Sequence, residues 1–450
     1  MKRNTFPRGI HPPELKDLTA EKPIEVLPPP EKVFVPLSQH FGKPAQPLVK
    51  KGDVVYLGQK IGDASSLFSA SVHAPVSGKV VSIDDYNHPC GKPVPTVTIA
   101  NDGQDLAPSE RPEENGKGPR LMPAEDPFSL SSEEICQKVR EAGVVGLGGA
   151  AFPTAVKLSP PKDANIDTII INGCECEPLL TGDYRLMMEY PEDILQGAEI
   201  IRLAASAKKV VVGIEDNKIK AFETLQRYLN GFPIELSLLK TKYPQGAEKN
   251  LIFALLRRAV PRGGLPFNVG VVVQNVGTAK AVWDAVKKGT PLYERVITCS
   301  GPGIKEPKNV LVRIGTPVQN VIDFCGGLND GANLLIIGGP MMGVSQWSLD
   351  VPLIKGTSGI LAWLPGPQPR EYSCIRCARC VDHCPMGLVP TQLAKFIKYE
   401  NLEEAEAWGV LDCVECGCCQ YICPSNIPLV HWIRLGKSSV SSLKSKKRAG

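Results

Sequence analysis

The sequence of 450 residues has little of three features that would place it in a specialised class of protein. It has no apolar run near the ~18 residues of a membrane-spanning helix, and stretches such as "NLLIIGGPMMG" are broken by glycine. Its net charge of +4 is small for its length and argues against a nucleic-acid partner. It shows no charged-then-apolar leader with a cleavage site. We therefore expect a soluble protein of a reducing cytoplasm, with roughly two to four domains.

Cysteine is plentiful and is concentrated in two matching runs. "CIRCARCVDHCP" (374–385) and "CVECGCCQYICP" (413–424) share the spacing Cys-x2-Cys-x2-Cys-x3-Cys-Pro. A disulfide framework is disfavoured because it belongs to small secreted chains and because the total of 15 cysteines is odd. Structural zinc is disfavoured because it uses Cys-x2-Cys pairs with a longer gap between them. The spacing is that of a protein with two [4Fe–4S] cubanes.

The same spacing assigns the ligands, because in two-cluster proteins the fourth cysteine of each run binds the other cluster. We call the two predicted sets the first set (Cys374, Cys377, Cys380 and Cys423) and the second set (Cys384, Cys413, Cys416 and Cys419). Cys418 is interpreted as a small packing residue. Between the runs, "TQLAKFIKYENLEEAEAW" (391–408) has helical periodicity. This module therefore resembles the α-helical ferredoxin domains of respiratory iron–sulfur subunits.

The middle of the chain is predicted to be an α/β domain with a mainly parallel sheet, over residues 129–292. Strand patterns and helix patterns alternate there, and the four expected buried strands are 168–172, 209–215, 234–240 and 269–275. A glycine loop, "VVGLGGAAFPT", precedes the first strand, and "NGCECEP", "YPQGAE" and "NVGTAKA" follow the first, third and fourth. The G-x-G-x-x-A in the loop follows a helix and runs into Pro153, unlike an ordinary dinucleotide fingerprint. Because parallel strands end at one edge, these segments are predicted to surround one crevice.

Further segments complete the expected domain organisation. Proline-rich residues 1–28 read as an extended arm, and residues 29–128 as short β-strands that resemble a barrel-sandwich of the biotinyl or lipoyl type. That domain lacks a lysine at its central joint, so we expect it to dock or brace rather than to carry a group. Residues 293–363 are similar to a β-grasp domain that binds soluble ligands. The two-cluster module covers residues 364–436, and 437–450 form a basic tail.

Four motifs, "GLGGAAFPTAVKL", "NGCECEPLLTGDYR", "YPQGAEK" and "NVGT", together resemble the FMN- and NADH-binding subunit of respiratory complex I. The resemblance implies that FMN and NAD(H) are held by Gly146, Gly148, Gly149, Lys157, Asn172, Glu175, Glu177, Gly246, Glu248, Asn275 and Thr278. It casts the two acids Glu175 and Glu177 as positioners of the nicotinamide, and Lys157 as a charge that stabilises phosphate or reduced flavin. Hydride transfer of this kind needs no general base.

The order of all the domains, from "RGIHPPE" to "CPSNIPL", resembles the RnfC family, the C subunits of Rnf electron-transport complexes, over essentially the full length. This resemblance implies a peripheral NAD(H)-handling subunit on the cytoplasmic face of the cell membrane. Its partners would be the other subunits of an ion-translocating ferredoxin:NAD+ oxidoreductase, including an iron–sulfur subunit. Flavin would lie between NAD(H) and the two clusters, because flavin exchanges electrons both singly and in pairs.

Two other functions stay open at the level of sequence. One is a cobalamin reductase of metabolic microcompartments, which has the same parts, although the regular cysteine runs favour the Rnf family. The other is a non-catalytic electron-relay or scaffold subunit whose flavin site has decayed. The flavin content of the purified protein separates this second alternative from the enzyme.

The cysteine spacing generates a prediction about metal content. Protein purified without oxygen is expected to contain about eight iron atoms and about eight acid-labile sulfides per chain, as two cubanes require. Iron, sulfide and zinc analysis on the same sample measures this. A count near four iron atoms, or stoichiometric zinc, would contradict the two ligand sets.

Overall fold

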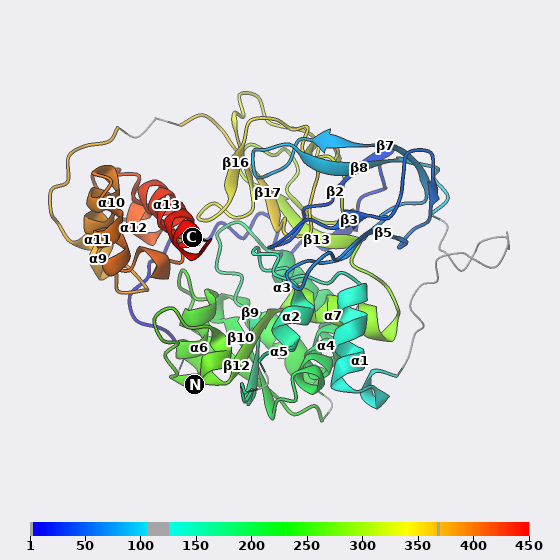
Figure 1. Ribbon diagram of the computed structural model, residues 1–450, viewed down its shortest axis with the longest axis horizontal. Helices are drawn as coiled ribbons and strands as arrows, with labels where there is room; N and C mark the ends of the chain where they lie inside the picture. The colour runs from blue at the N-terminus through cyan, green and yellow to red at the C-terminus, as the bar shows by residue number, and fades with distance from the viewer. Residues whose placement is uncertain (1–2, 106–125, 162, 230, 367–369, 450) are drawn as a thin grey trace.

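The computed structural model describes residues 3–105, 126–161, 163–229, 231–366 and 370–449. Residues 106–125, near the end of the predicted barrel-sandwich segment, lie outside the described ranges. Residues 367–369, in the proline-rich connection to the two-cluster module, also lie outside them. Figure 1 shows the α/β domain below, the β domains above it, and the helical module to one side.

A four-stranded parallel sheet forms the centre of the α/β domain. Its strands are β9 (Thr168–Gly173), β10 (Lys209–Glu215), β11 (Ile234–Leu239) and β12 (Val271–Asn275), in the order β11-β10-β9-β12. The strands are rich in Val and Ile, as expected for strands that are covered on both faces. The sequence therefore predicted all four strands and their parallel arrangement.

Helices cover both faces of this sheet because alternate side chains along each strand point to opposite sides. Ile169 and Ile171 pack toward one group of helices, whereas Ile170 packs toward α6. The first group consists of α1 (Ser132–Glu141), α2 (Thr154–Leu158), α3 (Gly182–Glu189), α4 (Pro191–Ala204), α5 (Ile219–Arg227) and α7 (Val276–Lys287), and α6 spans Glu248–Leu256. A capping box of Ser131 and Glu134 starts α1.

Two β domains lie against the α/β domain. The barrel-sandwich is built from β2 (Lys32–Pro36), β3 (Gln46–Pro47), β4 (Val54–Val55), β5 (Lys60–Asp63), β6 (Val72–His73), β7 (Gly78–Tyr86) and β8 (Val94–Asn101) in two antiparallel sheets. The β-grasp domain has α8 (Val318–Phe324) and a mixed sheet of β13 (Glu294–Ser300), β14 (Lys308–Arg313), β15 (Leu334–Ile337), β16 (Val344–Gln346) and β17 (Gly359–Trp363). The barrel-sandwich contacts the α/β domain through an ion pair between Lys60 and Glu141.

The N-terminal arm runs along the other domains (Figure 1). It forms a bridge from Asn4 to Leu239 at the edge of β11 and a second bridge from Ile10 to Tyr243. It ends in β1 (Ile24–Val26), which pairs in parallel with β14 and completes the six-stranded sheet of the β-grasp domain. The arm therefore contributes to the core of the molecule.

The helical module is a duplicated unit. Its helices are α9 (Arg379–Asp382), α10 (Pro390–Lys398), α11 (Leu402–Ala407), α12 (Cys418–Tyr421) and α13 (Leu429–Ala449). In each cysteine run, residues at equivalent places have left-handed backbone: Arg376 and Ala378 in the first run correspond to Glu415 and Gly417 in the second. A short helix follows these residues in both runs, and a longer helix follows each final Cys-Pro. The two runs thus fold alike.

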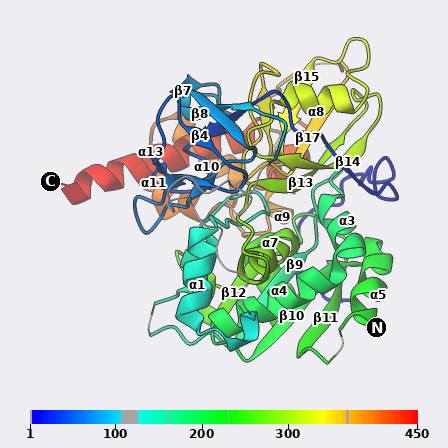
Figure 2. The same ribbon diagram turned by 90° about the vertical axis from the view of Figure 1, so that its right-hand side faces the viewer.

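Several local expectations need correction. "NVGTAKA", expected from its sequence to be a loop, is the first part of α7, because Asn275 caps that helix by accepting a hydrogen bond from the N–H of Gly277. The helical pattern over 391–408 is divided into α10 and α11 by Glu400, whose φ is +56°. The segment expected to be a basic tail continues α13, which projects away from the module in Figure 2.

The contact between α4 and α7 generates a stability prediction. A Cβ added to Gly197 of α4 would overlap the carbonyl oxygen of Ala279 in α7, and backbone cannot move aside cheaply. Gly197→Ala is therefore expected to lower the free energy of unfolding by about 1–3 kcal/mol, although alanine favours helix. Gly366→Ala is the matched control, because a Cβ there meets nothing within 4 Å. Equal melting temperatures for the two variants would contradict the close approach of the helices.

Candidate functional site

The candidate flavin site lies where β9 and β12 end side by side. Asn172 and Asn275 are partners in the register of this strand pair, so both side chains leave the sheet at one edge. The chain runs from β9 to β11 in one direction and then returns to β12 on the other side of β9. Such a reversal opens a crevice at the carboxyl ends of the strands, where α/β proteins bind ligands. The structure thus brings together the two asparagines that the sequence placed in the site.

The glycine loop lies beside this crevice. Its N–H at Leu147 donates to the hydroxyl of Thr278, at 2.9 Å, and a Cβ on Gly148 would meet Asn275 at 3.5 Å. Gly149 has a φ of +112° and open space where a side chain would lie. Residues 148–150 of the loop are exposed. This arrangement fits a flat ligand or a phosphate that approaches the main chain closely.

Residues of the loop after β11 and of the start of α6 contact Asn172 and Lys157. Asn172 donates through Nδ2 to the carbonyl of Gly246, at 2.9 Å. Lys157 forms an ion pair with Glu248, with 2.6 Å between Nζ and Oε1, and donates to the carbonyl of Val273. Two residues predicted from separate motifs are therefore paired. The side chain of Lys157 is partly exposed, so its charge can face a ligand at the rim.

The segment from the last residue of β9 to the residue before α3, residues 173–181, is called the acidic loop below. Its Glu175 has a φ of +44°, and its carboxylate accepts hydrogen bonds from the N–H groups of Asp183 and Tyr184. These N–H groups belong to the first turn of α3 and have no partner within the helix. Glu175 therefore fixes the acidic loop to α3, a contact that adds to the positioning role expected from the sequence.

Glu177 contacts the β-grasp domain and Tyr243 of its own domain. Its Oε2 accepts from the N–H of Met341 in the β-grasp turn, at 2.9 Å, and its Oε1 lies 3.3 Å from the hydroxyl of Tyr243. That hydroxyl donates to the carbonyl of Cys416, a member of the second set, at 2.8 Å. A hydroxyl has one hydrogen, so the contact between Glu177 and Tyr243 is complete when the carboxyl carries a proton. Burial raises the pKa of Glu177 to about 7, which favours that state.

Three residues of this region were missed by sequence reasoning as site residues. Tyr243 lies in the motif "YPQGAEK" and Asp183 in the motif "NGCECEPLLTGDYR". The signal that could have found them was a polar side chain inside a motif already assigned to the site. Asp183 accepts from Asn275 at 2.7 Å, and burial, followed by the charge of Glu175, raises the pKa of Asp183 to about 7. The third is Arg295 of β13, which donates to the carbonyl of Leu147 in the glycine loop. Nothing in the sequence near Arg295 indicates that contact.

The four thiols of the second set line one cavity. Its other walls include Cys418, Leu388 and Ile433, so the surroundings are largely apolar. The N–H groups of Glu415 and Leu388 point to the sulfurs of Cys413 and Cys384, at 3.3 and 3.4 Å. Four thiols with N–H donors in an apolar cavity fit a cubane cluster. Cys418 is fully buried and packs near Tyr243.

The first set lies at the surface. Cys374 and Cys377 are exposed, as are all residues from 371 to 379, whereas Cys380 is buried. Burial raises the pKa of the Cys380 thiol, and the charges of Cys423 and Cys374 raise it further. The N–H of Arg376 points to the sulfur of Cys374, which repeats the contact seen in the second run. The donor chemistry therefore fits a cluster here as well.

The pKa of a thiol in the second set indicates that binding of iron would release a proton. Burial raises the pKa of Cys413 to about 11, so this thiol is neutral at pH 7 until it binds metal, and loading releases its proton. Within the described ranges no group of three or more His, Cys, Asp or Glu side chains is spaced to hold a single metal ion. A cubane differs from a single ion because each sulfur binds a separate iron.

Four stretches of the chain match known family models. Residues 4–104 match the RnfC barrel sandwich hybrid domain, 139–284 the Nuo51 FMN-binding domain, 296–345 the SLBB domain, and 369–424 a 4Fe-4S dicluster domain. The models follow one another in the order expected from the sequence. They agree with the expected flavin and iron–sulfur cofactors and with the overall fold class.

Relatives match over nearly the whole chain. The C subunit of the proton-translocating ferredoxin:NAD(+) oxidoreductase complex of Clostridium ljungdahlii is 47% identical, covering 99% of this chain and 96% of its own. The C subunit of the Na(+)-translocating complex of Acetobacterium woodii is 42% identical, covering 99% of both chains. The C subunit of the ion-translocating oxidoreductase complex of Rhodobacter capsulatus is 44% identical, covering 98% and 84%. The chain belongs to the RnfC family.

Membership in the RnfC family confirms the resemblance found in the domain order. Among solved structures, a chain of an NAD+-reducing [NiFe]-hydrogenase in the H2-reduced state is similar, with 20% identity and a TM-score of 0.49. The match covers 71% of this chain and 63% of that one. That likeness is too distant to inform the site. In the part of the chain that the structure describes, no helix is both long and apolar enough to cross a membrane.

The raised pKa of Glu177 generates a prediction about stability and pH. Its ordinary pKa is 4.5 and its folded value is about 7, so between these values the folded protein keeps a proton that the unfolded chain releases. Stability is therefore expected to fall as the pH rises through this window, by up to about 3 kcal/mol from this residue. Glu177→Gln, which stays neutral, should make the loss of stability with rising pH smaller. Some loss should remain, because the pKa of Asp183 is also raised to about 7. Parallel curves of melting temperature against pH for the two proteins would contradict this.

Proposed function

We propose that this chain is the NAD(H)-handling subunit of a membrane-associated, ion-translocating ferredoxin:NAD+ oxidoreductase. It would exchange electrons between NAD(H) and partner subunits through FMN and two [4Fe–4S] clusters. The observation that carries the proposal is Tyr243, whose hydroxyl contacts Glu177 of the acidic loop and donates to the carbonyl of Cys416. One buried side chain thus connects the candidate flavin crevice to a cluster-binding loop. The names of the relatives support the same function.

Residues of the crevice would hold FMN and orient the nicotinamide. When bound, FMN would exchange hydride with NAD(H) as an electron pair and exchange single electrons with clusters. The backbone at Gly146, Gly148 and Gly149 would lie against the ligand, with Thr278 fixing the loop from below. Lys157 would offer its charge to phosphate or to reduced flavin. The remaining members (Asn172, Glu175, Glu177, Gly246, Glu248 and Asn275) would shape the crevice and orient the reacting groups, since catalysis here is positioning.

The positions of the thiol sets suggest which one faces which partner. The second set lies against the α/β and β-grasp domains, because Tyr243 contacts Cys416 and Gly417 packs on the carbonyl of Met341. The exposed Cys374 and Cys377 of the first set would face a partner that carries its own iron–sulfur centre. Electrons leave a cluster most readily where a second redox centre can approach closely, and an exposed ligand loop permits that approach.

The expected domain boundaries and location belong to the same proposal. Boundaries at 28, 128, 292, 363 and 436 divide the chain into arm, barrel-sandwich, flavin, β-grasp and cluster parts. A complex that translocates ions contains a membrane part, and NAD(H) is a cytoplasmic carrier. The chain would therefore sit peripherally on the cytoplasmic face of the cell membrane, bound to its partner subunits.

An anaerobic NADH titration tests the function. The purified protein is expected to show a flavin band that NADH bleaches, followed by electron paramagnetic resonance signals of reduced clusters. Cys374→Ser is expected to keep flavin bleaching and to slow electron transfer to a [4Fe–4S] ferredoxin by about tenfold or more, since it removes a ligand of the exposed set. The matched control is Cys90→Ser, because Cys90 is also an exposed thiol but lies in the barrel-sandwich domain.

Three outcomes would count against the proposal. Protein that holds iron and sulfide but no flavin would favour the non-catalytic relay. Flavin that NADH does not bleach would exclude the crevice as a hydride site. Equal transfer rates in Cys374→Ser and Cys90→Ser would show that the first set is not the exit to partners.

A further inference from the structure

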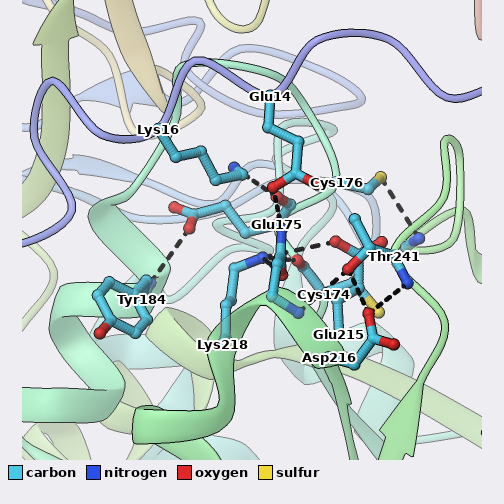
Figure 3. Close-up of polar contacts among 12 residues, drawn as sticks. Glu14, Lys16, Cys174, Glu175, Cys176, Tyr184, Glu215, Asp216, Lys218 and Thr241 are labelled. Atoms are coloured by element: carbon cyan, nitrogen blue, oxygen red, sulfur yellow. Dashed lines mark hydrogen bonds and ion pairs between the residues drawn. The ribbon is translucent and has the colours of Figure 1, made fainter.

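The motif "RGIHPPELKDLT" (8–19) in the arm has no part in the function proposed above. Its Lys16 enters the molecule and meets the acidic loop, as Figure 3 shows. The ammonium nitrogen lies 2.9 Å from the carbonyl oxygen of Glu175, 2.9 Å from that of Glu177 and 2.5 Å from that of Leu180. An ammonium group has three N–H donors. All three are therefore used on one loop that is about 160 residues away in the sequence.

A second lysine extends this contact along the same loop. Lys218 donates to the carbonyl of Cys174 at 2.7 Å, to the side chain of Asn217 at 3.0 Å, and forms an ion pair with Glu215 at 3.5 Å (Figure 3). Lys218 thus has a carboxylate partner, whereas Lys16 is held by main-chain carbonyls. Burial, followed by the charge of Lys218, lowers the pKa of Lys16. Placing a charge there costs free energy, which the three carbonyls offset.

The direction of these carbonyls decides where the acidic side chains point. With its carbonyls turned toward the arm, the loop places the carboxylate of Glu175 on α3 and that of Glu177 on Met341 and Tyr243. Glu175 holds a left-handed backbone, with φ of +44°, which is unfavourable for a residue with a side chain. Such a conformation persists only where surrounding contacts impose it. The ammonium of Lys16, which binds Glu175's own carbonyl, is one such contact.

We propose that Lys16 is a positioning residue for hydride transfer, because its ammonium holds the acidic loop in the conformation that connects the crevice to the second set. The effect on hydride transfer rests on the function proposed above. The effect on the loop does not, because it depends only on the contacts of this chain.

Lys16 can be removed without detaching the arm, because contacts on both sides of it remain. The N–H of Leu179 donates to the carbonyl of Glu14 at 2.8 Å, and the hydroxyls of Thr19 and Thr181 lie 2.6 Å apart. Further along, β1 stays paired with β14. A change at Lys16 therefore acts on the loop and leaves the path of the arm intact.

The test compares Lys16→Met with Lys22→Met in the full-length holoprotein. Lys22 is a matched control, because it lies in the same arm and also donates to a carbonyl, that of Pro307, but at an exposed position. Lys16→Met is expected to speed amide hydrogen exchange in residues 173–181 by about tenfold or more, as the loop opens locally. It should lower kcat for NADH-dependent dye reduction by about tenfold and change KM less, as loss of positioning does. Lys22→Met should match the unchanged protein in both.

The outcomes separate this inference from the function. Exchange and kcat in Lys16→Met that equal those of Lys22→Met would overturn it. If Lys16→Met lost protection in every domain, Lys16→Gln, which retains an uncharged N–H donor, would decide: faster exchange confined to 173–181 supports the inference, and unchanged exchange overturns it. If NADH did not bleach the flavin of the unaltered protein, the proposed function would be wrong. Amide hydrogen exchange in the acidic loop would still decide whether Lys16 holds that loop.

Discussion

The parallel pairing of β9 with β12 is the contact on which the rest of the site depends. It sets Asn172 beside Asn275, and it places the acidic loop and the start of α7 at one edge of the sheet. From β9 the chain continues to β10 and β11 on one side, and β12 lies on the other side of β9. The strand order reverses at this point, and such a reversal opens a crevice at the carboxyl ends of the strands. The glycine loop, which precedes the sheet in sequence, completes the crevice through Thr278.

Buried and partly buried cations support the loops around this crevice. Lys16 and Lys218 bind carbonyls of the acidic loop, Arg295 binds the glycine loop, and Lys355 binds the carbonyl of Gly143 at 2.7 Å just before that loop. A buried cation costs free energy unless hydrogen bonds offset the loss of water, and each of these cations has at least one main-chain carbonyl as a partner. Because these cations come from the arm, the α/β domain and the β-grasp domain, the shape of the crevice depends on three parts of the chain.

The sequence predicted the elements that repeat a pattern. The four strands were predicted because Val- and Ile-rich runs mark strands that are buried on both faces. The repeated cysteine spacing indicated two similar segments, and the two cysteine runs do fold alike. The sequence predicted less well where the decisive contact is made by main chain. Lys16 and Arg295 act on carbonyl oxygens of distant loops, and carbonyls are identical at every residue. Helix α7 was missed because Gly277 and Thr278 read as loop residues, whereas Asn275 caps a helix there.

The arm has a consequence for the order in which the protein can be made. Residues 24–26 leave the ribosome early, yet their partners in β14 are residues 309–311, and the partner of Asn4 is Leu239. Until those residues are synthesised, the arm has nothing to pair with, and contacts so far apart in sequence form slowly. The α/β sheet can form before the arm closes over it, since domains fold as units during translation. Closure of the arm is thus a late step of biogenesis, and the acidic loop would reach its final conformation only after most of the chain has emerged.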